Sequence, residues 1–165
     1  MANLDQKKIE AFIIEFFKQA DNSAPLVWFL PYIDTEQFHM GWTPTCQFDN
    51  HPGFEEFYRC LTGNLFDRKH EVNDINIEVN GETAKITFNI HLTAKCWFPP
   101  LPKSIHGENH AGFAWEFIPS DKNDVGVAIT NYQLTSVSFP EGSIIIDADK
   151  VFKYPTFMYG PWGFP

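Results

Sequence analysis

The stretch from Lys69 to Phe98, KHEVNDINIEVNGETAKITFNIHLTAKCWF, decides the fold, because two runs of alternating apolar residues meet in it at Asn80-Gly81. An Asn-Gly pair flanked by such runs is the strongest short-range signal for a β-hairpin. A two-residue turn at this pair predicts that Val79 faces Glu82. One face of the hairpin, which other parts of the chain must cover, then collects Ile75, Ile77, Val79, Ala84, Ile86, Phe88, Ile90 and Leu92.

A histidine opens the first strand of this hairpin. In an unbroken register His70 lies on the polar face, but Val72 is out of phase with Ile75, which indicates an extra residue near Asn73-Asp74. A β-bulge there turns His70 towards the apolar side. Because imidazole titrates near neutral pH, an inward His70 is a candidate general acid or base. The alternative is a surface histidine at the start of a strand.

The segments around the hairpin predict helices first and sheet afterwards, which is an α+β fold class. Apolar residues at helical spacing predict an amphipathic helix from Asp5 to Ala20 and a second one from Pro52 to Leu65. Shorter and later elements are one or two helical turns over residues 26–30, an extended segment over 33–42, and strands over about 108–118 and 127–139.

Length and composition exclude several classes of protein. A chain of 165 residues suits one domain. Its net charge of −9, with no cluster of Lys and Arg, argues against nucleic acid or an anionic membrane as partner. The start of the chain carries no export signal, and no segment is apolar over the length of a bilayer. Three cysteines without CxxC spacing indicate buried thiols in a reducing compartment. We therefore expect a soluble, cytoplasmic protein.

From Ile9 to Phe139 this order of elements resembles the nuclear transport factor 2-like superfamily. The stretch Lys69 to Ala84, KHEVNDINIEVNGETA, is similar to the part of SnoaL-like polyketide cyclases, scytalone dehydratase and bile-acid dehydratases in which a pocket histidine shortly precedes an Asp/Asn-Gly hairpin. The resemblance implies a cone-shaped, mostly antiparallel sheet wrapped around about three N-terminal helices. It also implies an apolar pocket open at one end, and a homodimer formed through the outer sheet face.

The same resemblance divides the chain into a domain over residues 1–139 and an aromatic tail over residues 140–165. We expect the tail to pack on the domain or on a partner subunit and to bury Phe157, Tyr159 and Trp162.

The family pattern also assigns catalytic candidates. His70 matches the pocket histidine. Relatives commonly place an Asp in the short strand after the second helix, where His39 is the best match here, and Asp34 and Tyr32 are backups. Two neighbouring imidazoles would lower each other's pKa, so at least one would stay neutral and basic; the alternative is that His39 bonds a backbone carbonyl in a packed strand. Tyr132 is a candidate donor to a developing enolate oxygen.

Aromatic residues predict a pocket for a flat, apolar, cyclic ligand, although a plain core is the alternative. The predicted binding residues are Phe16, Trp28, Tyr32, Trp42, Phe88, Cys96, His110, Phe113 and Trp115. A metal between His70 and His91 would need the unbroken register and lacks a third ligand, so no metal site is predicted. Motifs for phosphate loops, dinucleotides, zinc proteases and serine nucleophiles are missing, and no cofactor is expected.

These features favour a cofactor-independent lyase or isomerase, dehydratase- or cyclase-like, that acts on a small apolar cyclic metabolite. The alternative is a non-catalytic small-molecule-binding or assembly module that uses the same cone. A weaker similarity, to the phenazine-pathway condensing proteins over Phe98 to Phe117, lacks a matching catalytic glutamate in the last strand.

Overall fold

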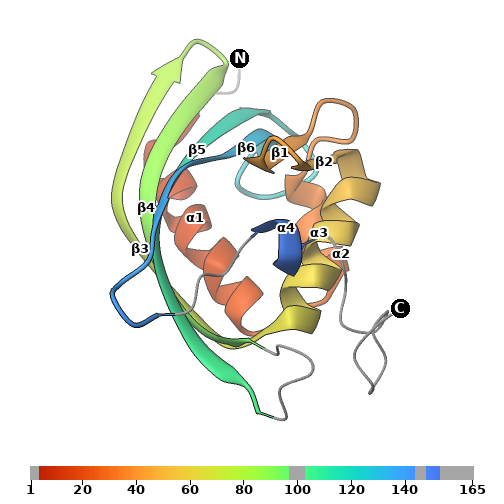
Figure 1. Cartoon of the computed structure of the whole chain (residues 1–165). Helices are drawn as coiled ribbons and strands as arrows, with labels where there is room; N and C mark the ends of the chain where they lie inside the picture. The colour runs from red at the N-terminus through yellow and green to blue at the C-terminus, as the bar shows by residue number, and fades with distance from the viewer. Residues whose placement is uncertain (1–3, 97–102, 144–147, 153–165) are drawn as a thin grey trace.

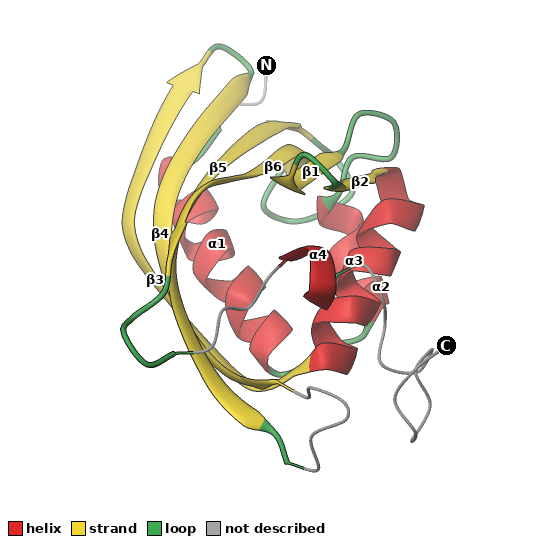
Figure 2. Ribbon diagram, viewed as in Figure 1, coloured by secondary structure: helices red, strands yellow, loops and turns green. Residues whose placement is uncertain are grey.

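A curved six-stranded sheet wraps around the helices in the computed structural model, which describes residues 4–96, 103–143 and 148–152 (Figures 1 and 2). The helices are α1 (Gln6–Asp21), α2 (Leu26–Phe29), the 3₁₀-helix η1 (Leu30–Tyr32), α3 (Asn50–Asn64) and α4 (Ala148–Val151). The strands are β1 (His39–Thr43), β2 (Cys46–Asp49), β3 (Leu65–Asn80), β4 (Thr83–Cys96), β5 (Ile105–Pro119) and β6 (Val127–Ser138). Their order is β2-β1-β6-β5-β4-β3, and only β1 and β6 pair in parallel. The predicted α+β cone is confirmed.

Helix α1 forms where the apolar spacing predicts it. The Asp5 carboxylate caps its start by accepting the backbone N–H groups of Lys7 and Lys8 at 3.0 and 3.3 Å. One face of the helix is buried against the concave side of the sheet, and this face consists of Ile9, Phe12, Ile13, Phe16, Phe17 and Ala20. Helix α3 also follows its prediction. It lies so close to the preceding strand that a Cβ on Gly53 would meet the Phe48 backbone carbon at 2.9 Å.

The hairpin is present, but its register differs from the prediction. Asn80 pairs with Thr83, so Gly81 and Glu82 form the turn and Val79 faces Ala84. Gly81 has a φ of +65°, which matches the glycine-first position of a type II′ turn. The register therefore moves by two residues, and an even shift keeps every side chain on its face. The predicted apolar face survives, with its β4 half fully buried.

The bulge predicted ahead of Ile75 is confirmed. The pairing jumps between Asn73 and Asn76, and Asp74 adopts a φ of 54°. On the far side of this bulge His70 stands opposite Leu92 on the concave face. Glu71 stands opposite His91 on the convex face, which is turned away from the helices. A direct pairing of His70 with His91 is thereby excluded.

Strand β2 and helix α4 were not predicted. Strand β2 forms a hairpin with β1 through Pro44-Thr45. The extended segment expected over residues 33–42 is present at its end, where residues 39–42 lie in β1, and its start contributes a bridge from Ile33 to Ile129. Helix α4 packs against α3 and β1 on the open side of the sheet (Figure 1), where the Asp149 carboxylate accepts the hydroxyl groups of Thr43 and Thr45. The tail residues Phe157, Tyr159 and Trp162 lie outside the described residues.

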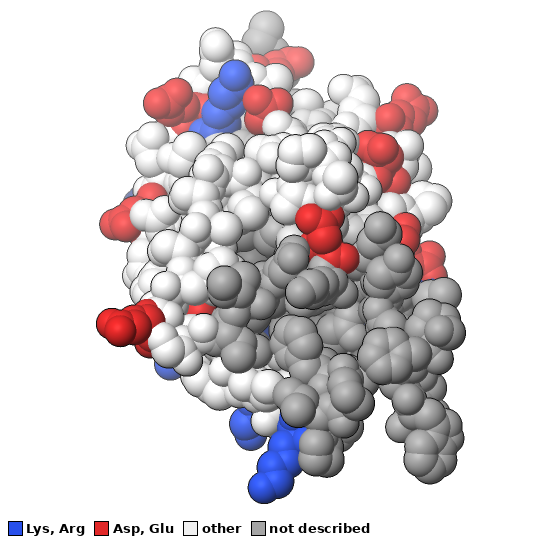
Figure 3. Space-filling model, in the orientation of Figure 1, with Lys and Arg blue, Asp and Glu red and all other residues white. Residues whose placement is uncertain are grey.

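Charged side chains on the face seen in Figure 3 are dispersed, with acidic groups spread over it and basic groups near its two ends. None of the helices in the described ranges combines the length and the apolar run that a bilayer crossing needs.

Candidate functional site

An apolar cavity of about 230 Å³ lies between the concave face of the sheet and helices α1 and α3. Aromatic rings from five elements form much of its wall, namely Phe16, Phe54, Phe57, Trp42, Phe113 and Tyr132. Phe152, which follows α4, packs on Trp42 with ring centroids 4.7 Å apart and closes one side. An engineered apolar cavity of about 150 Å³ accepts benzene. This one therefore suits a substituted single ring or a compact pair of rings.

A histidine and a carboxylate meet at the wall of this cavity. The Nδ1 atom of His70 lies 2.5 Å from Oδ1 of Asp21, and the other carboxylate oxygen accepts the His70 backbone N–H at 2.8 Å. The two side chains are 8% and 17% exposed, and His70 lines the cavity. Because a carboxylate can only accept at Nδ1, a neutral His70 carries its proton there. Its Nε2 lone pair is left available to a bound molecule.

The buried Arg68 fixes the end of α1 that carries Asp21. Its guanidinium donates to the carbonyl of Ala20, to the Ser23 hydroxyl at 2.8 Å, and to the carbonyls of Leu61 and Leu65 at the end of α3. Burial lowers the pKa of Arg68, while the nearby Asp21 opposes that shift. One side chain thus ties the C-termini of two helices to the start of β3, two residues before His70.

Besides His70, a few polar groups line the cavity, among them those of Tyr132, Trp42 and Asn109. Tyr132 is fully buried, and burial raises the pKa of its phenol, so it stays protonated and able to donate a hydrogen bond. The indole N–H of Trp42 is buried and has no hydrogen-bonding partner in the described part of the chain. Asn109 is 9% exposed. It stands opposite Leu92 on β4, and Leu92 in turn stands opposite His70 on β3. These groups can orient a ligand that carries an oxygen.

The structure does not bring His39 to this cavity. Strand alternation turns Met40 inward and His39 outward, where its Nδ1 lies 2.7 Å from the Asp49 carboxylate on β2. Asp34 is also outside, because its side chain caps a turn by accepting the backbone N–H groups of the second and third residues after it. The expected convergence of His39 and His70 on one cavity is therefore not found.

The structure places the predicted binding residues in three different surroundings. Phe16, Trp42 and Phe113 line the cavity. A second group packs in the surrounding core without lining it, and consists of Trp28, Tyr32, Phe88, Cys96 and Trp115. His110 lies on the convex face, stacked on His91 with ring centroids 4.5 Å apart, and so faces away from the cavity.

Asp21 is the functional residue that the sequence reasoning missed. It stands four residues after Phe17 and therefore falls on the apolar stripe of α1. The sequence did contain a signal for this residue, because an acidic side chain on the apolar stripe at the end of a helix is unusual and points towards the core. Asn109 lies on the same face of β5 as the buried residues Gly107 and Ala111, two positions from each, which is the pattern of an inward polar side chain.

No protein-family profile matches this sequence, and no curated protein is similar to it. Solved structures match over most of the chain. A candidate scytalone dehydratase from Novosphingobium aromaticivorans has a TM-score of 0.66 at 11% identity, covering 84% of this chain and 94% of its own. A nuclear transport factor 2-like superfamily protein from Salmonella enterica serovar Typhimurium has a TM-score of 0.60 at 16% identity, with 86% and 94% covered.

A candidate polyketide cyclase from Xanthomonas campestris has a TM-score of 0.52 at 12% identity, covering 78% of this chain and 90% of its own. Identities this low establish a shared fold and nothing finer. The resemblance that Lys69 to Ala84 predicted is thus confirmed at the level of architecture, and the chain has the nuclear transport factor 2-like fold.

Proposed function

We propose that this protein is a lyase or isomerase in which His70, oriented by Asp21, moves a proton on a small apolar cyclic metabolite bound in the cavity. The observation that carries the proposal is the His70 ring in the cavity wall with its Nδ1 atom 2.5 Å from the Asp21 carboxylate. A dyad of this kind holds one tautomer and stabilises the imidazolium that forms when Nε2 accepts a proton. Proton transfer of this kind needs no group beyond these side chains.

The chemistry follows from the positions of these groups. Nε2 of His70 takes a proton from a carbon next to a carbonyl, and the electron pair moves onto the carbonyl oxygen. Tyr132 or the Trp42 indole N–H donates a hydrogen bond to that oxygen. In dehydration of a β-hydroxyketone, the enolate electron pair then forms the Cα–Cβ double bond as the Cβ–O bond breaks, and the imidazolium gives its proton to the departing hydroxide, which leaves as water. In isomerisation of a β,γ-unsaturated ketone, the imidazolium instead returns the proton to the γ-carbon of the dienolate.

The shape of the wall supports a narrow substrate class. Aromatic rings cover most of it, and the polar groups are few and separate, which favours a flat ring system with one or two oxygens. Structural neighbours named as a scytalone dehydratase, a dehydratase from Streptomyces avermitilis and a polyketide cyclase are consistent with such chemistry on this fold.

The test uses one- and two-ring cyclic β-hydroxyketones as probes. Loss of water is followed by mass spectrometry, and exchange of the α-hydrogen in D₂O is followed by NMR. We expect His70→Ala to lower turnover by at least about 100-fold, the lower end for general acid–base catalysis. Asp21→Asn should lose nearly as much, because an amide N–H facing Nδ1 forces the wrong tautomer. His106→Ala, which changes an exposed histidine on β5, is the matched control.

The double variant of His70 and Asp21 separates a dyad from two independent groups. Residues that act as a unit give non-additive losses, so the double variant should be no slower than His70→Ala alone. Turnover by His70→Ala at the parental rate would overturn the proposal. A ligand that co-purifies with the protein and is unchanged on incubation would instead favour a binding or assembly module. The homodimer through the outer sheet face stays a prediction.

A further inference from the structure

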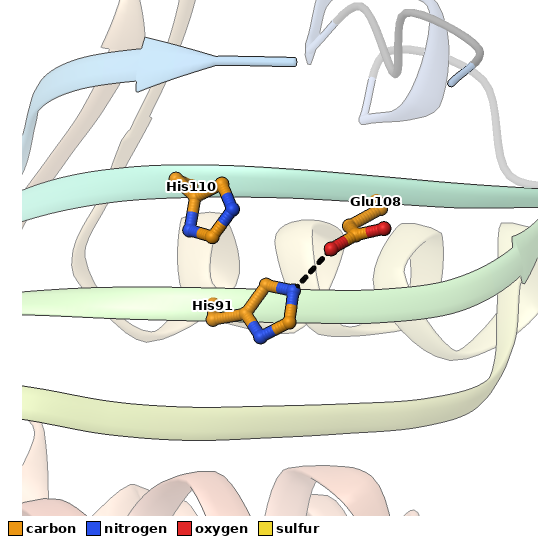
Figure 4. A group of neighbouring side chains, drawn as sticks. All are labelled: His91, Glu108 and His110. Atoms are coloured by element: carbon orange, nitrogen blue, oxygen red, sulfur yellow. Dashed lines mark hydrogen bonds and ion pairs between the residues drawn. The ribbon is translucent and has the colours of Figure 1, made fainter. Parts of the chain in front are cut away.

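Three potential metal ligands converge on the convex face of the sheet, away from the cavity. His91 on β4 and Glu108 and His110 on β5 each offer one ligand atom, and these atoms all lie within 4.8 Å of one another (Figure 4). The register explains this, because His91 stands directly opposite His110 and Glu108 lies two residues further along the same face. The imidazole rings are nearly parallel, at 8°, with centroids 4.5 Å apart.

The contacts of His91 match those of a metal-binding histidine. Its Nε2 atom lies 2.6 Å from the Glu108 carboxylate, and its Nδ1 atom lies 3.2 Å from the carboxylate of Glu71 on β3. Metal-bound histidines almost always donate their second ring N–H to a carboxylate or carbonyl, which fixes the tautomer and raises the basicity of the ligating nitrogen. Glu71 is itself held by Lys69 at 2.8 Å.

The backbone of Glu108 is also fixed. The Ser143 hydroxyl accepts the Glu108 backbone N–H at 2.8 Å and donates to the Glu108 carbonyl at 3.0 Å. Ligands held by such supporting contacts need little reorganisation on binding.

Local charge favours a cation at this point. The carboxylates of Glu108 and Glu71 lie 2.6 and 3.2 Å from the two ring nitrogens of His91, so two negatively charged groups flank this point. In a single chain, a polar groove lined by His91, His110, Asn89 and Ser136 borders the cluster and opens to solvent, on the same outer sheet face for which a homodimer contact is predicted.

We propose that His91, Glu108 and His110 form a binding site for one divalent transition-metal ion of the zinc type. Two imidazoles and one carboxylate suit Zn²⁺, Co²⁺ or Fe²⁺ and do not suit Mg²⁺ or Ca²⁺, which prefer oxygen ligands alone. Three protein ligands leave a coordination position open towards the groove. The proton between His91 and Glu108 leaves when the metal takes its place.

The required movement is small. Bonds of about 2.1 Å to a tetrahedral ion place ligand atoms about 3.4 Å apart. His91 and Glu108 must therefore separate from 2.6 Å, while His110 closes from at most 4.8 Å. All three side chains are exposed or half-exposed, so rotation about their own bonds is enough.

The test titrates Zn²⁺ into the full chain by calorimetry, after removal of any histidine tag and treatment with a chelator. We expect one ion per chain. His91→Ala and His110→Ala should each weaken binding by more than about 100-fold, and Glu71→Gln by about 10-fold, as loss of a supporting carboxylate does. His106→Ala, on the same face of β5, should bind as the parent does. Circular dichroism melting verifies that each variant is folded.

Three results would overturn the site. The first is parental binding weaker than about 0.1 mM, and the second is binding that His91→Ala and His106→Ala reduce equally. The third is a Co²⁺ spectrum with a thiolate charge-transfer band, since sulfur ligation would place the ion on one of the cysteines. His70→Ala should keep full Zn²⁺ affinity, so failure here and failure of the proposed dyad are distinguishable.

Discussion

Replacement of Arg68 by Met tests how the fold holds the dyad. The guanidinium is 7% exposed and serves three backbone carbonyls, those of Ala20, Leu61 and Leu65. Methionine has a similar reach but cannot donate, so these carbonyls lose a hydrogen bond from a charged donor, although those of Ala20 and Leu61 still accept a backbone N–H. A hydrogen bond to a charged group contributes about 1.5–3 kcal/mol. Removal of a desolvated charge returns part of that sum. We therefore expect a net loss of about 3 kcal/mol in the free energy of unfolding.

The assay is equilibrium unfolding in urea. With a slope of about 2 kcal/mol per molar, a loss of 3 kcal/mol lowers the midpoint by about 1.5 M. The matched control is Arg59→Met, which changes an arginine on the surface of α3 whose side chain is 60% exposed and pairs with Glu55. An exposed pair of this spacing contributes about 0.3–0.5 kcal/mol, which is a shift of about 0.2 M.

Equal midpoint shifts for the two variants would refute the reasoning, because they would mean that the buried guanidinium stabilises no more than an exposed one. A second readout connects Arg68 with the site. Since Arg68 ties the end of α1 to the start of β3, its loss should displace Asp21 relative to His70. Turnover of the β-hydroxyketone probes should then fall in Arg68→Met and not in Arg59→Met.

Three other predictions concern the bulge, the closing segment and the thiols. Asp74→Gly should be more stable than Asp74→Ala by about 1 kcal/mol in urea unfolding, because position 74 has a positive φ. Asn76, at an ordinary strand position, is the control, and there the alanine variant should be more stable than the glycine variant. Phe152→Ala should lower the free energy of unfolding by about 3 kcal/mol, since it removes a buried ring from Trp42, and an unchanged melting curve would contradict this packing. Burial raises the pKa of Cys60 to about 12 and of Cys96 to about 11, so both should react with a thiol reagent only after unfolding. Because the folded thiols hold their protons above the unfolded pKa of 9.0, stability should fall as pH rises from about 9 through about 12, and less so in Cys60→Ala.

The parts of the fold that depend on local pattern could be predicted from the sequence. Helix α1, helix α3 and the β3-β4 hairpin are specified by apolar spacing within one element. The extended segment that holds β1 could also be predicted, but its parallel pairing with β6 could not, because β6 lies some 90 residues later and the pairing has no local signal. Helix α4 depends on Asp149 reaching Thr43 and Thr45, which only the folded chain brings together.

In the turn between β3 and β4, packing across the strands overrides the local preference of the turn residues. Asn80-Gly81 favours a type I′ turn, yet the chain turns at Gly81-Glu82. That choice sets Ile77 opposite Ile86 and Val79 opposite Ala84, which pairs apolar residues along the covered face. Gly81 can adopt the positive φ that either turn requires. The pairing of apolar residues across the two strands therefore determines which turn forms.

Of the two residues of the candidate dyad, His70 could be predicted from the sequence and Asp21 could not. The bulge that aims His70 inward left a trace in the phase of Val72 against Ile75, and this trace could be read without any partner. The position of Asp21 depends on how the end of α1 meets β3, which Arg68 and the sheet curvature determine together. The family pattern predicts the acidic partner in the strand that holds His39, whereas the carboxylate that contacts His70 is that of Asp21 at the end of α1.

One extra residue in β3 separates the two proposed sites. Adjacent residues of a strand point to opposite faces, so His70 enters the cavity while Glu71 supports His91 on the convex face. Without the extra residue at Asp74, the segment before it would slip by one position. The imidazole of His70 would then face solvent and the carboxylate of Glu71 would enter an apolar cavity, where an unpaired charge is strongly unfavourable. The backbone strain at Asp74 is therefore offset because the bulge keeps the Glu71 carboxylate out of the apolar cavity, and the same bulge fixes the faces of the dyad and of the histidine cluster.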